Sequence, residues 1–305
     1  MFSRDFTSLF FGRLLNGLAS AMFVAPSIAA ASLIVSEELV GKSLSYRSAA
    51  VSLGALVGPI LGGYLVDYVS YTMAFALAAF LSLLNAIVCI VFHLKTHGRS
   101  RFPLEKEKGS WRDAINPTVL LFTVTSFVSG LAFFTFRSLL QSQYKDLGYP
   151  SSLYGLLIAC FSAITMILRI ISPRVLDNGI RRLFVISAIC YFVVGLGSIV
   201  LSWAYTYPEA YIPVAFYGVG FGFLVPAVQS IISMSTTKNV RNRAMTIYAM
   251  GSDLGGFVGG IILGYVAQIY GYELAYMLIG LLLMIDPVLV LLYLRRMKTV
   301  DISPH

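Results

Sequence analysis

The sequence is poor in charge, cysteine and histidine, and each shortage excludes a class of protein. Charged residues make up 12% of the 305 residues, about half the share of an ordinary soluble domain. Apolar residues make up 58%, and the mean hydropathy is +0.81. A chain of this composition has too little polar surface to enclose itself in water. We therefore expect it to be surrounded by lipid.

The few reactive side chains point to neither a metal centre nor an enzyme. Cys89, Cys160 and Cys190 all fall within apolar stretches, where a thiol is usually a small packing residue. The three histidines are scattered over a span end, a loop and the C-terminus, and the sequence contains no H-E-x-x-H, no G-x-S-x-G and no cluster of acids. We expect no enzyme activity, no disulfide, no metal and no cofactor.

What the sequence does contain is long apolar stretches. About 20 mainly apolar residues suffice for a helix to cross a bilayer. Because lipid offers the backbone no hydrogen-bond partner, continuous apolar runs of this kind predict helices rather than a barrel. The fold class expected is an all-α integral membrane protein. We expect nine spans, at residues 8–34, 45–68, 71–94, 117–141, 151–172, 183–204, 210–234, 244–269 and 273–294.

Basic residues divide unevenly between the two sets of connections, which predicts the orientation. Eighteen of the 22 lysines and arginines fall in one set, and the other set with its span ends holds only Arg4, Arg13, Arg137 and Lys145. Because cytoplasmic loops carry the excess of positive charge, the C-terminus is expected inside and the N-terminus outside. The net charge of +8 is not gathered on one soluble face, so nucleic acid is not an expected partner.

The longest connection divides the spans into two groups. We expect a partial N-terminal bundle of three spans at residues 1–94, a cytoplasmic linker at 95–116, a six-helix bundle at 117–297 and a cytoplasmic tail at 298–305. An internal repeat supports this division: Gly54, Gly58, Gly62 and Gly63 recur with the same spacing as Gly251, Gly255, Gly259 and Gly260. Many transporters are built from two such related groups.

Three motifs resemble those of the major facilitator superfamily. The segment from Gly54 to Gly63, with Pro59 inside it, resembles the family's antiporter motif on the fifth helix. The segment Leu9–Gly17, with Arg13 and Asn16, resembles the fourth-helix motif, although asparagine stands where glutamine is common. The turn at 173–182 resembles a degraded basic loop motif in which Asp177, Arg181 and Arg182 match.

The resemblance implies a secondary transporter in the cell membrane that exports a small molecule by proton antiport through alternating access. It also implies twelve helices in two bundles of six, whereas this chain begins at the counterpart of the fourth. We therefore expect Met1 to be an internal or misassigned start, or a truncated gene product. The expected partners are the lipid bilayer, a small-molecule substrate and protons, and we expect a monomer. The alternative is a non-transporting remnant or scaffold; a membrane enzyme is a remoter possibility.

The glycine motif has two interpretations that overlap. Gly54, Gly58 and Gly62 share one helix face, so a neighbouring backbone can approach closely, and Pro59 permits a bend. The first interpretation is tight packing alone. In the second, the same contact seals or flexes the bundle during transport. The second copy of the motif is open to the same two interpretations.

Several polar residues inside spans are candidates for coupling or for substrate contact. A basic group at the membrane centre costs about 2.5–3.5 kcal/mol, so Arg13 either reaches outward to the interface or faces a cavity, with Asn16 one turn further in. Asp253 lies roughly 13 Å into its span on the face opposite the glycine stripe, and it serves either proton exchange or helix packing. For Asp286, which precedes Pro287, packing is the favoured role.

The remaining candidates are less specific. Arg137, which follows Phe133, Phe134 and Phe136 near the outer end of its span, either attracts an anionic substrate or anchors the helix at the interface. Gln229, Tyr217 and Tyr248 are candidates for the polar lining of a substrate pathway.

Cysteine labelling tests the predicted orientation. A cysteine placed at Lys106 should be protected from an impermeant thiol reagent added to intact cells, because residues 95–116 and 298–305 are expected in the cytoplasm. A cysteine placed in the 142–150 connection, expected outside, should be labelled. Labelling of the Lys106 position from outside would reverse the predicted topology.

Overall fold

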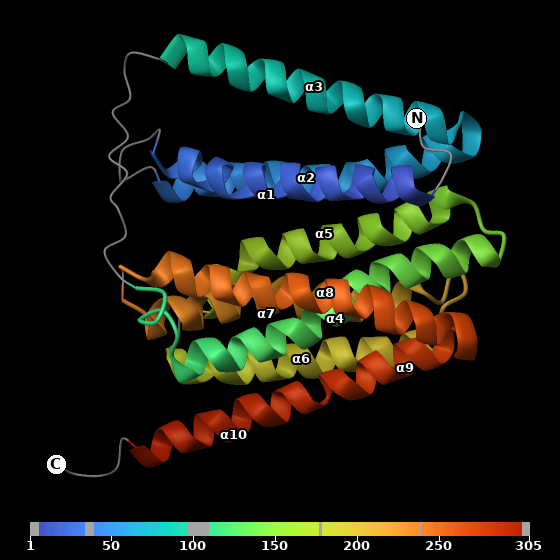
Figure 1. Ribbon diagram of the computed structural model, residues 1–305. Coiled ribbons are helices and arrows are strands. Elements are labelled where there is room, and N and C mark those ends of the chain that lie inside the picture. Colours follow the sequence, from blue (N-terminus) through green and yellow to red (C-terminus); the bar gives the residue numbers. More distant parts are fainter. Residues whose placement is uncertain (1–5, 34–39, 97–109, 177–178, 238, 301–305) are drawn as a thin grey trace. The chain divides into compact units, whose positions relative to one another are not determined.

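The computed structural model describes residues 6–33, 40–96, 110–176, 179–237 and 239–300, and every regular element in these ranges is a helix (Figure 1). The chain forms two compact units, Met1–Glu105 and Lys106–His305. The division between them falls within the 95–116 connection. Each unit is described by itself.

The first unit contains three helices: α1 (Phe6–Leu33), α2 (Val40–Tyr68) and α3 (Tyr71–Thr96). α2 contacts both of its neighbours. A tight turn separates α2 from α3, and the Ser70 hydroxyl accepts a hydrogen bond from the Met73 N–H at 3.2 Å. This bond satisfies one of the N–H groups that the start of a helix leaves without a partner.

The second unit contains seven helices. They are α4 (Pro117–Asp146), α5 (Ser151–Leu176), α6 (Ile180–Leu201), α7 (Tyr211–Ser235), α8 (Arg241–Tyr270), α9 (Tyr272–Leu283) and α10 (Ile285–Val300). Together with stretches of α2 and α3, they give eight segments of the described chain that are long and apolar enough to cross a membrane. α1 is helical as well but is not one of these eight.

Hydrogen bonds at the helix ends hold the second unit in register. Asn116 caps α4 by accepting from the Val119 N–H at 2.8 Å, and its side-chain amide donates to the Ser235 carbonyl at the end of α7 at 2.9 Å. Pro117 occupies the first turn of α4, where a missing N–H costs nothing. One asparagine therefore both starts a helix and ties it to another.

The opposite ends of the helices are joined by tyrosines. Tyr272, at the start of α9, donates a hydrogen bond to the Asp146 carboxylate at the end of α4. Tyr205 donates to Glu273 at 3.2 Å, and this bond raises the pKa of Tyr205. Gly271, with φ of 92°, makes the turn between α8 and α9 in a conformation that residues with a side chain rarely adopt.

The closest helix pair is α4 with α8, which lie side by side in Figure 1. A Cβ added to Gly255 would collide with the Phe127 carbonyl oxygen, and one added to Gly251 would lie 2.5 Å from the Thr123 carbonyl oxygen. Gly251, Gly255 and Gly259 are all buried. The second copy of the glycine stripe therefore lets two backbones touch.

The surface of α4 that faces α8 also carries small residues. A Cβ added to Gly130 would collide with the Ser252 carbonyl, and the Ser126 hydroxyl donates to the Tyr248 carbonyl across the pair at 2.8 Å. Small residues and hydroxyls at such contacts are typical of membrane helices, which gain little from apolar burial against one another. Backbone contact and one hydrogen bond thus join α4 to α8.

The last predicted span, 273–294, is confirmed as one apolar segment of membrane length, Tyr272–Arg296, but it is not one continuous helix. The chain forms α9 and α10, with a break at Met284, and the bend between them is visible in Figure 1. Pro287 explains the break, because it has no N–H for the Leu283 carbonyl and its ring crowds the preceding turn.

Replacing a single glycine tests the α4–α8 contact. Gly255→Ala should lower the free energy of unfolding by about 1–3 kcal/mol, the usual cost of overpacking, because the new methyl group meets the backbone of α4. Gly260→Ala is the matched control, since no described atom lies within 4 Å of its added Cβ. The thermal unfolding midpoint of the purified chain in detergent is the measurement. Equal midpoints for the two variants would contradict the contact.

Candidate functional site

Asp253 lies on an exposed face of α8. Thr246, Ala249, Phe257 and Gly260 share this face and are exposed on the surface of their unit. The buried stripe of Gly251, Gly255 and Gly259 lies on the other side of the helix. The glycine contact with α4 therefore turns Asp253 outward from its own bundle.

The neighbours of Asp253 leave its carboxylate accessible. The Thr246 hydroxyl donates to the Asn242 carbonyl of its own helix at 2.9 Å, so its proton is not directed at Asp253, about two turns further along α8. Phe257, 68% exposed, stands one turn further along. The surface around Asp253 thus combines an acid, a hydroxyl and an aromatic ring.

Arg137 is an exposed cation in the C-terminal half of α4. Its guanidinium lies 5.7 Å from the centre of the Phe133 ring, a cation–π geometry. The Tyr154 hydroxyl of α5 donates to the Arg137 carbonyl at 3.0 Å and holds the backbone there. This arrangement orients the guanidinium without neutralising its charge.

Tyr217 lies in the core of the second unit. Its hydroxyl is hydrogen-bonded to the Ser198 hydroxyl at 2.6 Å, and its ring stacks on Phe136 with centroids 4.2 Å apart. Phe221 and Phe133 extend the same aromatic group. In this conformation Tyr217 packs helices together and does not reach the surface.

Gln229 is exposed on α7, one turn beyond Pro226. It lines an open groove of about 380 Å³ together with Ser230, Ser233 and Met234. Tyr248 of α8 is half-buried and packs against the hydrophobic core, and its backbone carbonyl accepts the Ser126 hydrogen bond. Gln229 is therefore the more exposed of these two predicted lining residues.

The candidates of the first unit all lie on its helices. Arg13 and Asn16 are exposed on α1, and Pro59 lies inside α2. Within this unit no described atom comes within 4 Å of a Cβ added to Gly54, Gly58 or Gly62. Gly63 is buried. The first copy of the glycine stripe thus lacks the neighbour that its second copy has in α4.

The loop motif is only partly within the described residues. Asp177 lies outside them. Arg181 and Arg182 are exposed in the first turn of α6, immediately after Gly179, whose φ of 90° forms the bend.

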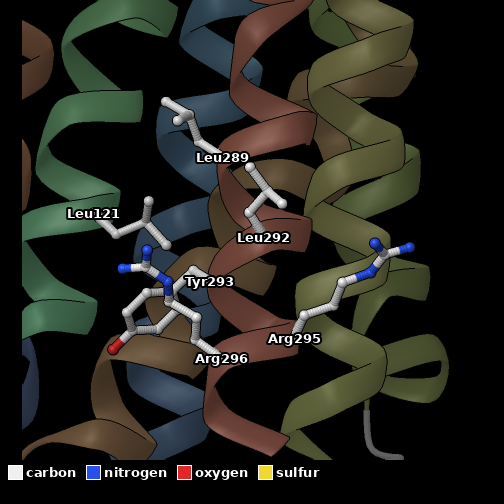
Figure 2. A pocket seen from close by; sticks show the side chains of 6 residues that line it. All are labelled: Leu121, Leu289, Leu292, Tyr293, Arg295 and Arg296. Carbon is white, nitrogen blue, oxygen red and sulfur yellow. The ribbon is translucent and has the colours of Figure 1, made fainter. Parts of the chain in front are cut away.

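A groove of about 490 Å³ runs between α4 and α10 (Figure 2). Leu121, Leu289 and Leu292 line it, and Tyr293 closes one side with its hydroxyl bonded to Thr118 at 2.9 Å. Figure 2 shows Arg296 turned back toward α4 above the Tyr293 ring, whereas Arg295 points away from it. None of the predicted site residues lines this groove.

The sequence did not reveal which side chains surround Asp286. The side chain is 1% exposed and is the most deeply buried acid of the described chain. Close by, Tyr191 donates a hydrogen bond to the Thr125 hydroxyl at 2.8 Å. The sequence signal was an aspartate followed by a proline inside an apolar span. The nearby hydroxyls could not be predicted, because Tyr191 and Thr125 belong to two other helices, α6 and α4. Among the described residues no group of three or more side chains could hold a metal ion.

Comparison with known proteins identifies the family. The sequence profile of the Major Facilitator Superfamily matches residues 1–240 and 215–304. The chain belongs to the major facilitator superfamily. It is therefore a multi-pass α-helical membrane protein of a transporter family, as the glycine motif and the helix-rich structure predicted.

Curated relatives within the superfamily are of low identity. The multi-drug resistance efflux pump PmrA of Streptococcus pneumoniae is 28% identical over 286 residues, covering 87% of this chain and 67% of that protein. The purine ribonucleoside efflux pump NepI of Escherichia coli is 24% identical over 301 residues, covering 98% of this chain and 74% of the pump. The chain thus spans about two thirds to three quarters of these relatives.

A solved structure also resembles part of the chain. A crystal structure of the peptide transporter POT in complex with sulfate aligns with a TM-score of 0.49 at 20% identity, covering 57% of this chain and 37% of the transporter. At that level the likeness adds nothing to the assignment.

The first glycine stripe can be tested in a transport assay. Gly58→Leu should reduce transport more than Ala55→Leu, because we expect the glycine face of α2 to meet another backbone during transport, and leucine would block that approach. Uptake into or efflux from vesicles, measured at equal expression, compares the two. Equal activity would remove the stripe from the mechanism.

Proposed function

We propose that the chain exports a small molecule in exchange for protons by alternating access. The observation that carries the proposal is the match to the superfamily over nearly the whole chain. In such transporters, two related helical groups move against each other around a site near the middle of the membrane. The two units and the repeated glycine stripe fit this scheme.

Export is favoured over uptake by the antiporter-like motif and by the relatives. The segment from Gly54 to Gly63 matches that motif at every position. Both curated relatives described above are named as efflux pumps. Their named substrates differ, so we propose only a small organic molecule as the substrate.

Asp253 is the acid that we assign to proton coupling. A coupling acid must bind a proton in one access state and release it in the other, so it has to lie within a span and still be reachable. The outward face of α8 gives Asp253 both properties, since the glycine contact holds the opposite face against α4. Arg137 and Gln229, exposed on α4 and α7, are the proposed substrate contacts in this unit.

The first unit supplies the remaining elements of the proposal. Arg13, with Asn16 one turn away on α1, is placed to influence proton transfer. The stripe of Gly54, Gly58 and Gly62 on α2 is the proposed gating contact. With the basic connections on the cytoplasmic side, the C-terminus is inside the cell and protons enter as substrate leaves.

Removal of the Asp253 charge tests the coupling role. In proteoliposomes with an imposed pH gradient, Asp253→Asn should abolish gradient-driven efflux while the protein stays folded and inserted, because the amide cannot bind and release a proton. Glu273→Gln makes the same change in an acid that is hydrogen-bonded to Tyr205 at a helix end, and it should retain efflux. Full gradient-driven efflux by the Asn variant would refute the assignment. If the unaltered chain shows no efflux of any tested substrate, a non-transporting scaffold becomes the better description.

A further inference from the structure

We propose that Asp286 is a second, exchangeable proton-binding site, enclosed in the core of the second unit and separate from Asp253. The site is formed by the break between α9 and α10 together with the hydroxyl pair of Tyr191 and Thr125. It does not depend on the proposed transport reaction, because it concerns only the binding of a proton.

Asp286 is buried, and one oxygen of its carboxyl group has no hydrogen-bond partner. Its side chain is 1% exposed, and its Oδ2 atom has no hydrogen-bond partner. It lies near the middle of the apolar segment Tyr272–Arg296, about 15 Å along the helix from Arg296 by the helical rise. An ionised carboxylate in such a place is costly unless it is paired, and the usual response of such a group is to become neutral.

The neighbouring hydroxyls favour the protonated acid. Tyr191 donates its proton to the Thr125 hydroxyl at 2.8 Å, and Thr125 donates to the Phe122 carbonyl at 3.4 Å. A hydroxyl has one proton to donate and lone pairs to accept with. With both protons committed, Tyr191, which lies within electrostatic reach of Asp286, offers only lone pairs toward the acid and has no proton left to donate to a carboxylate.

The helix break offers the protonated acid a second acceptor. Pro287 has no N–H, so the Leu283 carbonyl lacks the donor that a continuous helix would supply. A carboxylic acid three residues further on can donate to such a group, whereas a carboxylate cannot. Protonation of Asp286 and the geometry of the break are therefore linked.

The start of α10 opposes these effects and makes the proton exchangeable. Asp286 occupies the first turn of this 16-residue helix, where unpaired N–H groups and the helix dipole stabilise negative charge. Burial favours the acid and the helix start favours its anion. Because these two effects oppose each other, the proton is exchangeable.

The other ionisable groups around the site leave Asp286 without a counter-ion. Tyr248 of α8 and Cys190 of α6 lie within electrostatic reach of Tyr191. On α9, Tyr276 is bonded to Gln143 and Glu273 to Tyr205. Tyr293 of α10 is bonded to Thr118 of α4. In the described part of the chain no basic side chain pairs with Asp286.

Infrared difference spectroscopy against pH detects this proton directly. The full chain, purified into lipid nanodiscs, should show the carbonyl stretch of a protonated buried acid at low pH, and the band should disappear as the pH rises. Asp286→Asn should lose this band. Glu273→Gln makes the same chemical change in an acid that is hydrogen-bonded to Tyr205 at a helix end, and it should keep the band.

Two further variants keep the test decisive if Asp286→Asn does not fold. Asp286→Glu retains an acid in a new position and should shift the band. Tyr191→Phe removes the acceptor and should shift it as well, without removing it. A band that survives Asp286→Asn, one that Asp286→Glu leaves unmoved, or the absence of any pH-dependent band in the unaltered chain would overturn the proposal.

Discussion

Close contact between helix backbones is the constraint on which the second unit depends. Lipid tails are as apolar as leucine, so helices in a membrane gain little by hiding apolar side chains from one another. They associate instead where small residues let backbones touch. The contact of Gly251 and Gly255 with α4 is the tightest example. It fixes the rotation of α8, and the rotation of α8 decides which of its polar residues faces out of the bundle.

The two intramembrane acids of this unit differ for that reason. Asp253 lies on the side of α8 that faces away from α4 and is exposed on its unit. Asp286 lies behind α4 and α6, beside hydroxyls whose protons are already committed. An exposed acid such as Asp253 suits repeated exchange of its proton with the solvent. A buried acid such as Asp286 suits a proton that moves only when the surrounding helices move. Composition does not distinguish them, since both are aspartates within apolar runs.

The repeat relates the two units but does not make them equivalent. The stripe on α8 packs against α4, whereas within the first unit no described atom lies within 4 Å of a Cβ added to Gly54, Gly58 or Gly62 on α2. A row of glycines that meets no other backbone contributes little to packing, because glycine has no side chain. The same sequence pattern therefore makes a backbone contact in the second unit and none with the described atoms of the first.

The sequence alone determined the helical fold, the segment bounds to within a few residues and the family. Each of these depends on local properties: apolar length, the backbone's need for internal pairing, and glycine spacing along one helix face. The tertiary structure decided what depends on contacts between distant segments. It divided the last span at Met284, placed Tyr217 in the core, and brought Tyr191 and Thr125 to Asp286. Which side chains meet across helices is set by helix rotation, and rotation follows from packing that no single segment encodes.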